Sequence, residues 1–471
     1  MTKNARTAEN RCIAMETNAA AYFNEAYMQS FFDLKLRKKQ GGGRDHLTPE
    51  KFYAKYGNEF GKIASQCLDG TYRFSYYNEK LVSKGSGKYP RVLSIPSIRD
   101  RLVLGVLNDY LSIEFPDCVQ RIVPNRLMAN VVDMMSSAEG DIYFLRTDFH
   151  DFYGSISIKM LENMLSSKIK DENIKELIRK AVTTQTISGH KPCRNNRKPK
   201  YGIPQGLAIS NILASIYMKS FDEEFGSNYA DSYIRYVDDI LFLNLGKPIY
   251  KRPMLKELQR RNLRLRLSPE KCKQGIVGKD RIEFLGYVIK SKDKVFVREK
   301  NITKFLSRIA ALAARCKEGL DKPHVRPIFI KEDSAYIEYY IEEFNQVISG
   351  FKYEHIPYGW IAYFQTITDV ASLYGMDRVI HRRILKELPT PITSKINRLV
   401  DTYYAIRRES GGSLVKDYDA LTDTGSKRCL LLHRGWIRED WDYTDEQIED
   451  IFQSYMNFIK KRELRNIGEI S

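Results

Sequence analysis

The sequence lacks paired cysteines, long apolar runs and a secretory signal. Its seven cysteines stand apart, with no CxxC pair, at Cys12, Cys67, Cys118, Cys193, Cys272, Cys316 and Cys429. This spacing argues against a zinc knuckle and against a disulfide framework, so we expect reduced thiols. No run approaches the roughly 18 apolar residues of a membrane-spanning helix, and polar residues interrupt the first 20 positions throughout. We therefore expect a soluble protein that stays in the cytoplasm and does not bind membranes.

Acidic residues are too few to balance the basic ones. The chain has 76 Lys and Arg residues against 59 Asp and Glu residues, which gives a formal net charge of +17. A polyanionic partner suits this excess, because each neutralised phosphate releases counterions and adds affinity. Nucleic acid is the leading candidate, and a basic but otherwise ordinary soluble protein is the alternative on charge alone. The 471 residues exceed one ordinary core and predict more than one packed unit.

The apolar pattern of the first 290 residues predicts both helices and strands. Helical spacing occurs over residues 10–40, 50–70 and 99–115, and short apolar runs predict strands over 72–82, 89–95 and 141–147. The runs 72–82 and 89–95 flank the loop KGSGK, which indicates a hairpin with a basic tip. Ser210 is placed to cap a helix that continues to Phe221.

The pattern after residue 300 is mainly helical. The clearest helix is the last one, where Thr444 and Gln447 have the spacing of a capping box. We find no internal repeat, and the best candidate boundaries lie near 290–300 and at Gly411–Gly412.

Two adjacent acids, Asp238 and Asp239, follow Tyr236-Val237 between the apolar strands SYIRY and ILFLN. Clustered carboxylates in an apolar setting are costly unless a cation lies between them. A third acid, Asp148, follows the predicted strand DIYFLRT. Carboxylates are natural ligands for Mg²⁺, and nucleotidyl transfer uses two metal ions about 3.5–4 Å apart. The dipeptide alone is equally explained by a solvated turn.

These acids stand in blocks that resemble the motifs of reverse transcriptases, in the family's order. The blocks are YPRVLSIPSIRDR at 89–101, similar to the fingers block of bacterial members; TDFHDFYGSI at 147–156, similar to the first catalytic block; GIPQGLAISNILASIYM at 202–218, similar to GxPQGxxxSPxL; YVDD at 236–239, similar to the central motif; LRLSPEKC at 265–272, similar to the block that ends in Glu-Lys; and IEFLGYVI at 282–289, similar to the FLG hairpin or primer grip. Asn211 stands where the third block usually has proline.

The resemblance implies an α+β right-hand polymerase fold. It predicts an N-terminal helical extension over residues 1–45, and fingers and palm with an antiparallel palm sheet over 46–290. A helical thumb or X-like region is expected over 291–400, followed by a C-terminal helical extension over 401–471. The helix at 301–317 would carry a basic thumb face of Lys304, Arg308 and Arg315.

The resemblance also implies a role for individual residues. Asp148 and Asp238 would bridge two Mg²⁺ ions, for which Mn²⁺ is a substitute, and Asp239 would help set their geometry. Lys271 would protonate the departing pyrophosphate. The remaining candidates would bind the nucleotide: Tyr153 beneath the sugar, where its ring excludes a 2′-hydroxyl; Gln205 and Gly206 at the nascent base pair; Lys88, Arg91, Arg99 and Arg101 at the triphosphate; and Phe149.

The implied activity is RNA-directed DNA polymerisation, with an RNA template, dNTPs and a DNA product. No RNase H-like array of acids and no zinc-type or HNH-type Cys/His cluster follows the thumb. What remains resembles the stand-alone bacterial enzymes of the unknown and abortive-infection groups, which are related to group II intron and retron enzymes. Antiphage defence is therefore expected, with a dedicated non-coding RNA template or with untemplated or protein-primed synthesis.

Other readings remain open. The chain could be a retron-type or group II intron-derived enzyme, or an RNA-binding or splicing-assisting module that keeps the polymerase fold. A metal-dependent nuclease would explain the acids but not the PQG block or Tyr153. The helices beyond residue 400 could serve homo-oligomerisation, RNA binding or coverage of the thumb.

Overall fold

The computed structural model describes residues 18–37, 43–83, 89–119, 124–189, 199–330, 332–408 and 412–467. The chain forms two compact units. The first comprises Met1–Arg121, Asp148–Tyr233 and Tyr250–Lys271, and the second comprises Ile122–Thr147, Ile234–Ile249 and Cys272–Ser471. The expected α+β class, with antiparallel sheets and a mainly helical C-terminal part, is confirmed. Lys88, a candidate triphosphate ligand, lies outside the described residues.

Short helices build most of the first unit. They are α1 (Glu25–Phe31), α2 (Pro49–Tyr56), α3 (Phe60–Leu68), α4 (Ile98–Glu114), α6 (Phe152–Ser155), α7 (Ile158–Leu165), α8 (Glu172–Thr183), α9 (Ser210–Phe221), α10 (Ser227–Tyr229) and α11 (Lys251–Arg260). The helix expected over 50–70 is two helices, because a 3-10 turn at Gly57–Glu59 separates α2 from α3. Within the helical stretch expected over 10–40, α1 passes into a π-helical turn at Phe32–Leu36.

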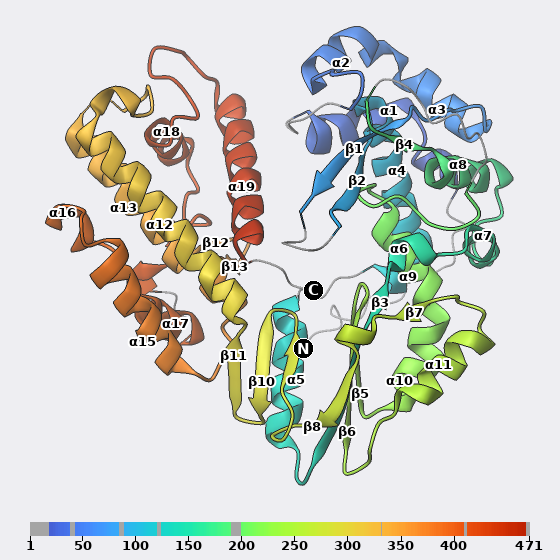
Figure 1. Ribbon diagram of the computed structural model, residues 1–471. Coiled ribbons are helices and arrows are strands. Elements are labelled where there is room, and N and C mark those ends of the chain that lie inside the picture. The colour runs from blue at the N-terminus through green and yellow to red at the C-terminus, as the bar shows by residue number, and fades with distance from the viewer. Residues whose placement is uncertain are drawn as a thin grey trace, which may run out of the picture. The chain divides into compact units, whose positions relative to one another are not determined.

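The predicted hairpin is confirmed in the first unit, although its first strand begins at Tyr77 rather than at residue 72 and the loop KGSGK at its tip lies outside the described residues. Strands β1 (Tyr77–Val82) and β2 (Arg91–Ile95) pair antiparallel, and β4 (Thr186–Ile187) lies parallel to β1 (Figure 1). The buried carboxylate of Asp100 on α4 holds the segment that leads into β1. It accepts hydrogen bonds from the Tyr72 hydroxyl at 2.8 Å, the Ser97 hydroxyl at 2.8 Å and the Ser75 amide at 3.1 Å. Burial raises the pKa of Asp100, although these hydrogen bonds oppose the shift.

Strand β3 (Ile142–His150) passes from the second unit into the first between Thr147 and Asp148. Its first part pairs antiparallel with β8 (Lys273–Ile276) in the second unit. Its last residues pair with β7 (Arg266–Leu267) in the first unit, where Phe149 lies opposite Leu267. The strand is therefore longer than the predicted run 141–147, and Asp148 lies inside it.

The second unit combines β-hairpins with a large helical group. Its other strands are β5, which spans Ser232–Tyr236 and begins in the first unit, β6 (Asp239–Leu245), β9 (Ile282–Phe284), β10 (Tyr287–Ser291), β11 (Lys294–Val297), β12 (Phe351–Tyr353), β13 (Ile356–Tyr358) and β14 (Lys416–Asp417). The FLG block forms the tight turn between β9 and β10, where Leu285 and Gly286 both have positive φ.

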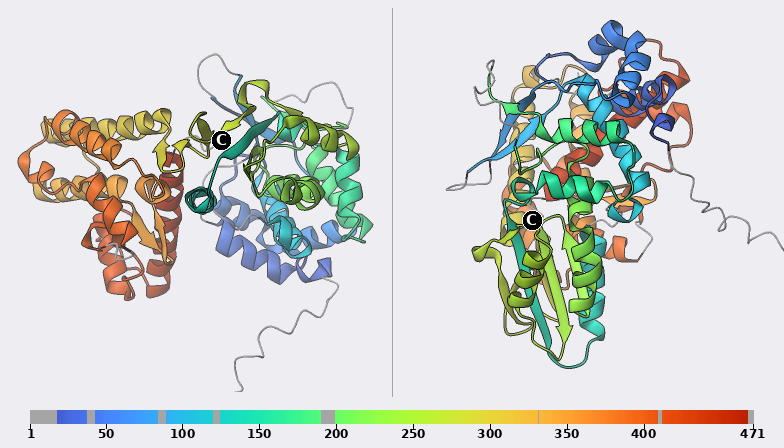
Figure 2. Two further views of the ribbon diagram at one scale, coloured as in Figure 1. Left: turned by 90° about the horizontal axis from the view of Figure 1, so that it is seen from below. Right: turned by 90° about the vertical axis from the view of Figure 1, so that its right-hand side faces the viewer.

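The helices of the second unit pack around two apolar clusters within the described residues. They are α5 (Pro124–Ser137), α12 (Glu299–Asp321), α13 (Asp333–Ser349), α14 (Trp360–Tyr363), α15 (Val370–Val379), α16 (Thr390–Thr393), α17 (Leu399–Arg407), α18 (Thr424–His433) and α19 (Asp445–Ile467). Those from α12 onward form the group coloured gold to red in Figures 1 and 2. The fully buried Trp360 stacks on Phe305 with ring centroids 4.6 Å apart, which joins α14 to α12. No helix in the described part of the chain is long and apolar enough to cross a bilayer.

The predicted C-terminal extension joins the rest of the second unit through a small sheet. Strand β14 runs parallel to β12, and Phe351 shares a core with Tyr418 and Phe452. The capping box is confirmed, since the Thr444 amide donates to Gln447 Oε1 at 3.0 Å and the Gln447 amide donates to Thr444 Oγ1 at 3.3 Å.

One part of the predicted basic thumb face is wrong. Lys304 and Arg315 on α12 are exposed, but Arg308 turns toward α19 and forms an ion pair with the buried Glu463 at 3.2 Å. A buried carboxylate requires a cation, which explains why Arg308 faces the protein.

Candidate active site

Asp148 and Lys271 meet in the first unit. The Asp148 carboxylate is 2.7 Å from Lys271 Nζ and accepts a 3.0 Å hydrogen bond from the Ser268 hydroxyl. The backbone fixes this arrangement, because the Ser268 amide donates to the Asp148 carbonyl oxygen at 2.8 Å. The Asp148 side chain is almost completely buried, so Lys271 supplies the compensating charge that burial requires. Sequence reasoning missed Ser268, whose only signal is its place three residues before Lys271.

The turn between β5 and β6 holds Val237 and Asp238, as predicted, but Asp239, also expected at the turn, is the first residue of β6. Val237 has φ +60°, a left-handed conformation that costs a β-branched residue about 1–3 kcal/mol. Arg235 supports the turn, because its Nη1 donates to the Val237 carbonyl oxygen at 2.9 Å. Such local strain is common where a functional group must be presented in a fixed direction.

Asp239 is fully buried in the second unit and forms an ion pair with Arg146 of β3. Arg146 Nε and Nη2 lie 3.1 and 3.0 Å from Asp239 Oδ1, and the Arg146 side chain is only 10% exposed. Asp238 is half-buried. Sequence reasoning missed Arg146. The signal was an arginine directly after the apolar run Ile142–Leu145 of the predicted strand, because a charge in a buried strand needs a partner.

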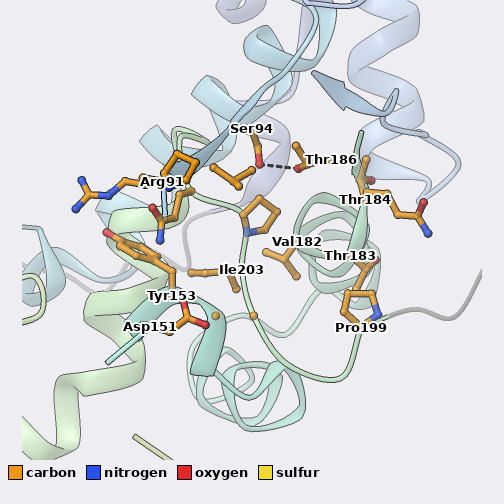
Figure 3. A pocket seen from close by; sticks show the side chains of 17 residues that line it. Arg91, Ser94, Asp151, Tyr153, Val182, Thr183, Thr184, Thr186, Pro199 and Ile203 are labelled. Carbon is orange, nitrogen blue, oxygen red and sulfur yellow. Dashed lines mark hydrogen bonds between the residues drawn. The ribbon is translucent and has the colours of Figure 1, made fainter. Parts of the chain in front are cut away.

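Three predicted nucleotide-binding residues, Arg91, Tyr153 and Gln205, line one pocket of about 420 Å³ in the first unit (Figure 3). The Gln205 carbonyl oxygen accepts a 2.7 Å hydrogen bond from the Ser94 amide, which attaches the PQG loop to β2. Gly206 has φ +102°, and a Cβ there would lie 3.1 Å from the Ser94 carbonyl oxygen. This position therefore requires glycine.

The predicted cap at Ser210 is wrong. The N-cap of α9 is Ile209, and the Ser210 hydroxyl instead donates to the Pro204 carbonyl oxygen at 2.6 Å. Ser210 thus fixes the PQG loop against the start of α9. An isolated sequence pattern cannot distinguish these two uses of a serine, since both place it at the beginning of a helix.

Tyr153 is held from two sides. Its ring makes a T-shaped contact with the Phe152 ring, with centroids 5.5 Å apart, and its hydroxyl donates to Asn211 Oδ1 at 2.7 Å. Phe149, expected at the nucleotide, is buried and stacks on Phe152. It does not line the pocket.

The other predicted arginines lie away from the pocket lining. Arg99 donates to the Arg73 carbonyl oxygen at 3.1 Å and lies over the Tyr72 ring. Arg101 donates to the Pro96 carbonyl oxygen at 3.0 Å, and burial lowers its pKa. Arg91 is thus the predicted triphosphate ligand that the structure places beside Tyr153 and Gln205.

The described residues contain no group of three or more His, Cys, Asp or Glu side chains arranged to hold a metal ion. The carboxylates of Asp148 in the first unit and of Asp239 in the second unit are each buried and offer hard oxygen donors of the kind that divalent cations prefer. Each carboxylate forms an ion pair with one side-chain cation, Lys271 or Arg146. A divalent ion would share or replace that compensation.

Comparison with known families agrees with the sequence blocks. A family model described as reverse transcriptase (RNA-dependent DNA polymerase) matches residues 82–289. The chain is 28% identical over 197 residues to an uncharacterized 91 kDa protein in the cob intron of Schizosaccharomyces pombe, which covers 40% of this chain and 23% of that protein. It is 26% identical over 167 residues to the group II intron-encoded protein LtrA of Lactococcus lactis, which covers 34% of this chain and 27% of that protein. The chain thus spans about a quarter of the length of these relatives.

Two solved structures are also similar. Telomerase from Candida albicans, in complex with a fragment of telomeric RNA, has a TM-score of 0.42 and 12% identity, and the match covers 86% of this chain and 69% of the telomerase chain. Apo telomerase from Candida tropicalis has a TM-score of 0.38 and 14% identity, and the match covers 52% of this chain and 60% of the telomerase chain.

Proposed function

Because this chain carries a reverse transcriptase domain, we propose that it is an RNA-directed DNA polymerase that adds deoxynucleotides by two-metal nucleotidyl transfer. The observation that carries the proposal is the pocket that brings Arg91, Tyr153 and Gln205 together from three separate sequence blocks. A metal-dependent nuclease or a pure RNA-binding module has no need for this combination.

We assign the metal ions to Asp148, Asp238 and Asp239. Two Mg²⁺ ions, or Mn²⁺ in their place, would activate the attacking 3′-oxygen and stabilise the leaving oxygen. The buried positions of Asp148 and Asp239 support the assignment, because low solvent exposure strengthens the attraction between carboxylate and cation. Lys271 would carry a proton on Nζ for the departing pyrophosphate, and its ion pair with Asp148 keeps that ammonium group at the reacting centre.

We assign the incoming nucleotide to the pocket. The guanidinium of Arg91 would neutralise the triphosphate, with Lys88, Arg99 and Arg101 as further candidates. The ring of Tyr153 would lie beneath the sugar and leave no room for a 2′-hydroxyl. Gln205 and Gly206 would contact the nascent base pair, and the glycine backbone permits close approach. Phe149 would act through Phe152, since its ring supports the ring that contacts Tyr153.

The proposed partners are an RNA template, dNTPs and a DNA product in the cytoplasm. A role in antiphage defence, with a non-coding RNA template or with protein-primed or untemplated synthesis, extends the proposal. It is supported by the resemblance of the sequence blocks to those of stand-alone bacterial enzymes. Because this chain is similar to intron-encoded proteins, an intron-derived enzyme is the main alternative.

Incorporation of labelled dNTPs with Mg²⁺ tests the proposal, with and without primed RNA, beside the Asp238→Ala/Asp239→Ala variant. Loss of metal binding should reduce the rate roughly a thousandfold or more. Incorporation that the double variant lacks would support the polymerase. Tight RNA binding without incorporation under any condition would favour the RNA-binding module.

A further inference from the structure

We propose that Asn211 is a positioning residue that holds Tyr153 as the barrier against ribonucleotides. The inference rests on the proposed function and adds a determinant of sugar specificity to it. The Tyr153 hydroxyl donates to Asn211 Oδ1 at 2.7 Å, although the two residues are 58 positions apart. Tyr153 lines the same pocket as Arg91 and Gln205, so this hydrogen bond acts directly on a wall of the nucleotide site.

The helix does not require an asparagine at this position. Asn211 is the second residue of α9, and the side chain of the N-cap residue Ile209 makes no capping hydrogen bond. Proline, which the resembling sequence block usually has here, is tolerated in the first turn of a helix but has no side-chain oxygen that could accept a hydrogen bond. The hydrogen bond to Tyr153 is therefore the physical use that the structure shows for the asparagine amide.

The start of α9, which carries Asn211, is itself held in place by hydrogen bonds. Ser210, the neighbour of Asn211, donates to the Pro204 carbonyl oxygen at 2.6 Å, and the adjoining Gln205 carbonyl oxygen accepts from the Ser94 amide at 2.7 Å. The Asn211 amide thus extends from a helix start that is bonded to the PQG loop. Through this hydrogen bond, the position of the PQG loop determines where the Tyr153 hydroxyl lies.

Two contacts together set the direction of the ring. Phe152 forms a T-shaped contact with the ring, with a 5.5 Å centroid distance and a 62° interplanar angle, and Asn211 fixes the hydroxyl at its far end. Without the Asn211 contact the ring would sample more side-chain orientations, and some of these would leave space for a 2′-hydroxyl. Selectivity for deoxynucleotides should then fall while deoxynucleotide incorporation continues.

The test is the ratio of kcat/KM for dGTP to kcat/KM for GTP, measured with the full-length protein opposite a template cytidine. Asn211→Ala should lower this ratio roughly three- to tenfold, as expected for one lost hydrogen bond. The change should come mainly from a lower KM for GTP. Asn211→Asp keeps an acceptor oxygen and should restore most of the ratio. The exposed Asn457→Ala on α19 is the matched control and should leave the ratio unchanged.

Tyr153→Phe removes the same hydrogen bond from its other side and should lower the ratio by a similar factor. Combining it with Asn211→Ala should add little, because both changes remove one interaction. An unchanged ratio in Asn211→Ala, or an equal loss of dGTP and GTP incorporation, would overturn this inference and leave the polymerase assignment intact. A wild-type protein that incorporates neither nucleotide would refute the proposed function, and this inference with it.

Discussion

Replacing Arg146 with methionine should destabilise the protein, because Arg146 compensates the buried charge of Asp239. Arg146 is only 10% exposed and Asp239 is fully buried, with the two groups 3.0 Å apart. Removing one partner of a buried ion pair typically costs about 3–5 kcal/mol, since the remaining charge stays in a poorly solvated place. For a unit of this size, that corresponds to a fall in Tm of roughly 6–20 °C.

Thermal unfolding in Mg²⁺-free buffer, followed by circular dichroism, measures this loss. A double-mutant cycle with Asp239→Asn isolates the pair, and the double variant should be more stable than the summed single losses predict by roughly 1–3 kcal/mol. Arg281→Met is the matched control in the same unit. Arg281 pairs with Glu283 at the surface, where such a change costs less than about 1 kcal/mol.

Two results would refute this reasoning. One is an Arg146→Met variant as stable as the Arg281→Met control. The other is additive behaviour of Arg146→Met and Asp239→Asn, which would show that the ion pair contributes no coupling energy. Either would also remove the argument that Asp239 requires a compensating cation, whether an arginine or a metal ion.

Further substitutions test other parts of the structure. Gly206→Ala places a side chain on a backbone with φ +102° and should cost about 1–3 kcal/mol, which would be measured as a higher KM for dNTPs. The control is Gly140→Ala, which has φ +79° and open space around it and should leave KM unchanged. Glu463→Leu leaves the half-buried Arg308, and Arg462 beside it, without this partner and should lower stability by about 1–3 kcal/mol in thermal unfolding, while adding Arg308→Leu should recover part of the loss. Thr444→Ala removes half of the capping box and should cost about 1 kcal/mol by the same measurement, and no change would show that the cap is replaced by solvent.

Short-range patterns in the sequence predicted their structures well. The capping box at Thr444 and Gln447 spans three residues, and the β1–β2 hairpin connects neighbouring runs. The turn at Asp238 was predicted from the two apolar strands beside it. In each case the residues that determine the element lie close together in the chain, so their spacing carries the information.

The partners of the acids could not be predicted in the same way. Ser268 and Asp148 are 120 positions apart, and Arg146 and Asp239 are 93 apart. Which side chains meet across such distances depends on strand pairing and register, and the sequence pattern does not contain this information. Arg308 shows the same limit, because helical spacing placed it on a basic face while a distant buried glutamate determines its direction.

The most direct test of the central claim is whether the protein copies an RNA sequence into DNA. A primed RNA of mixed sequence would be incubated with Mg²⁺ and three of the four dNTPs, with Asp148→Asn as the inactive control. We predict that wild-type synthesis stops one nucleotide before the first position that requires the missing dNTP and that the control makes no product. Extension that ignores the template sequence, or equal product from Asp148→Asn, would contradict a template-copying polymerase centred on Asp148.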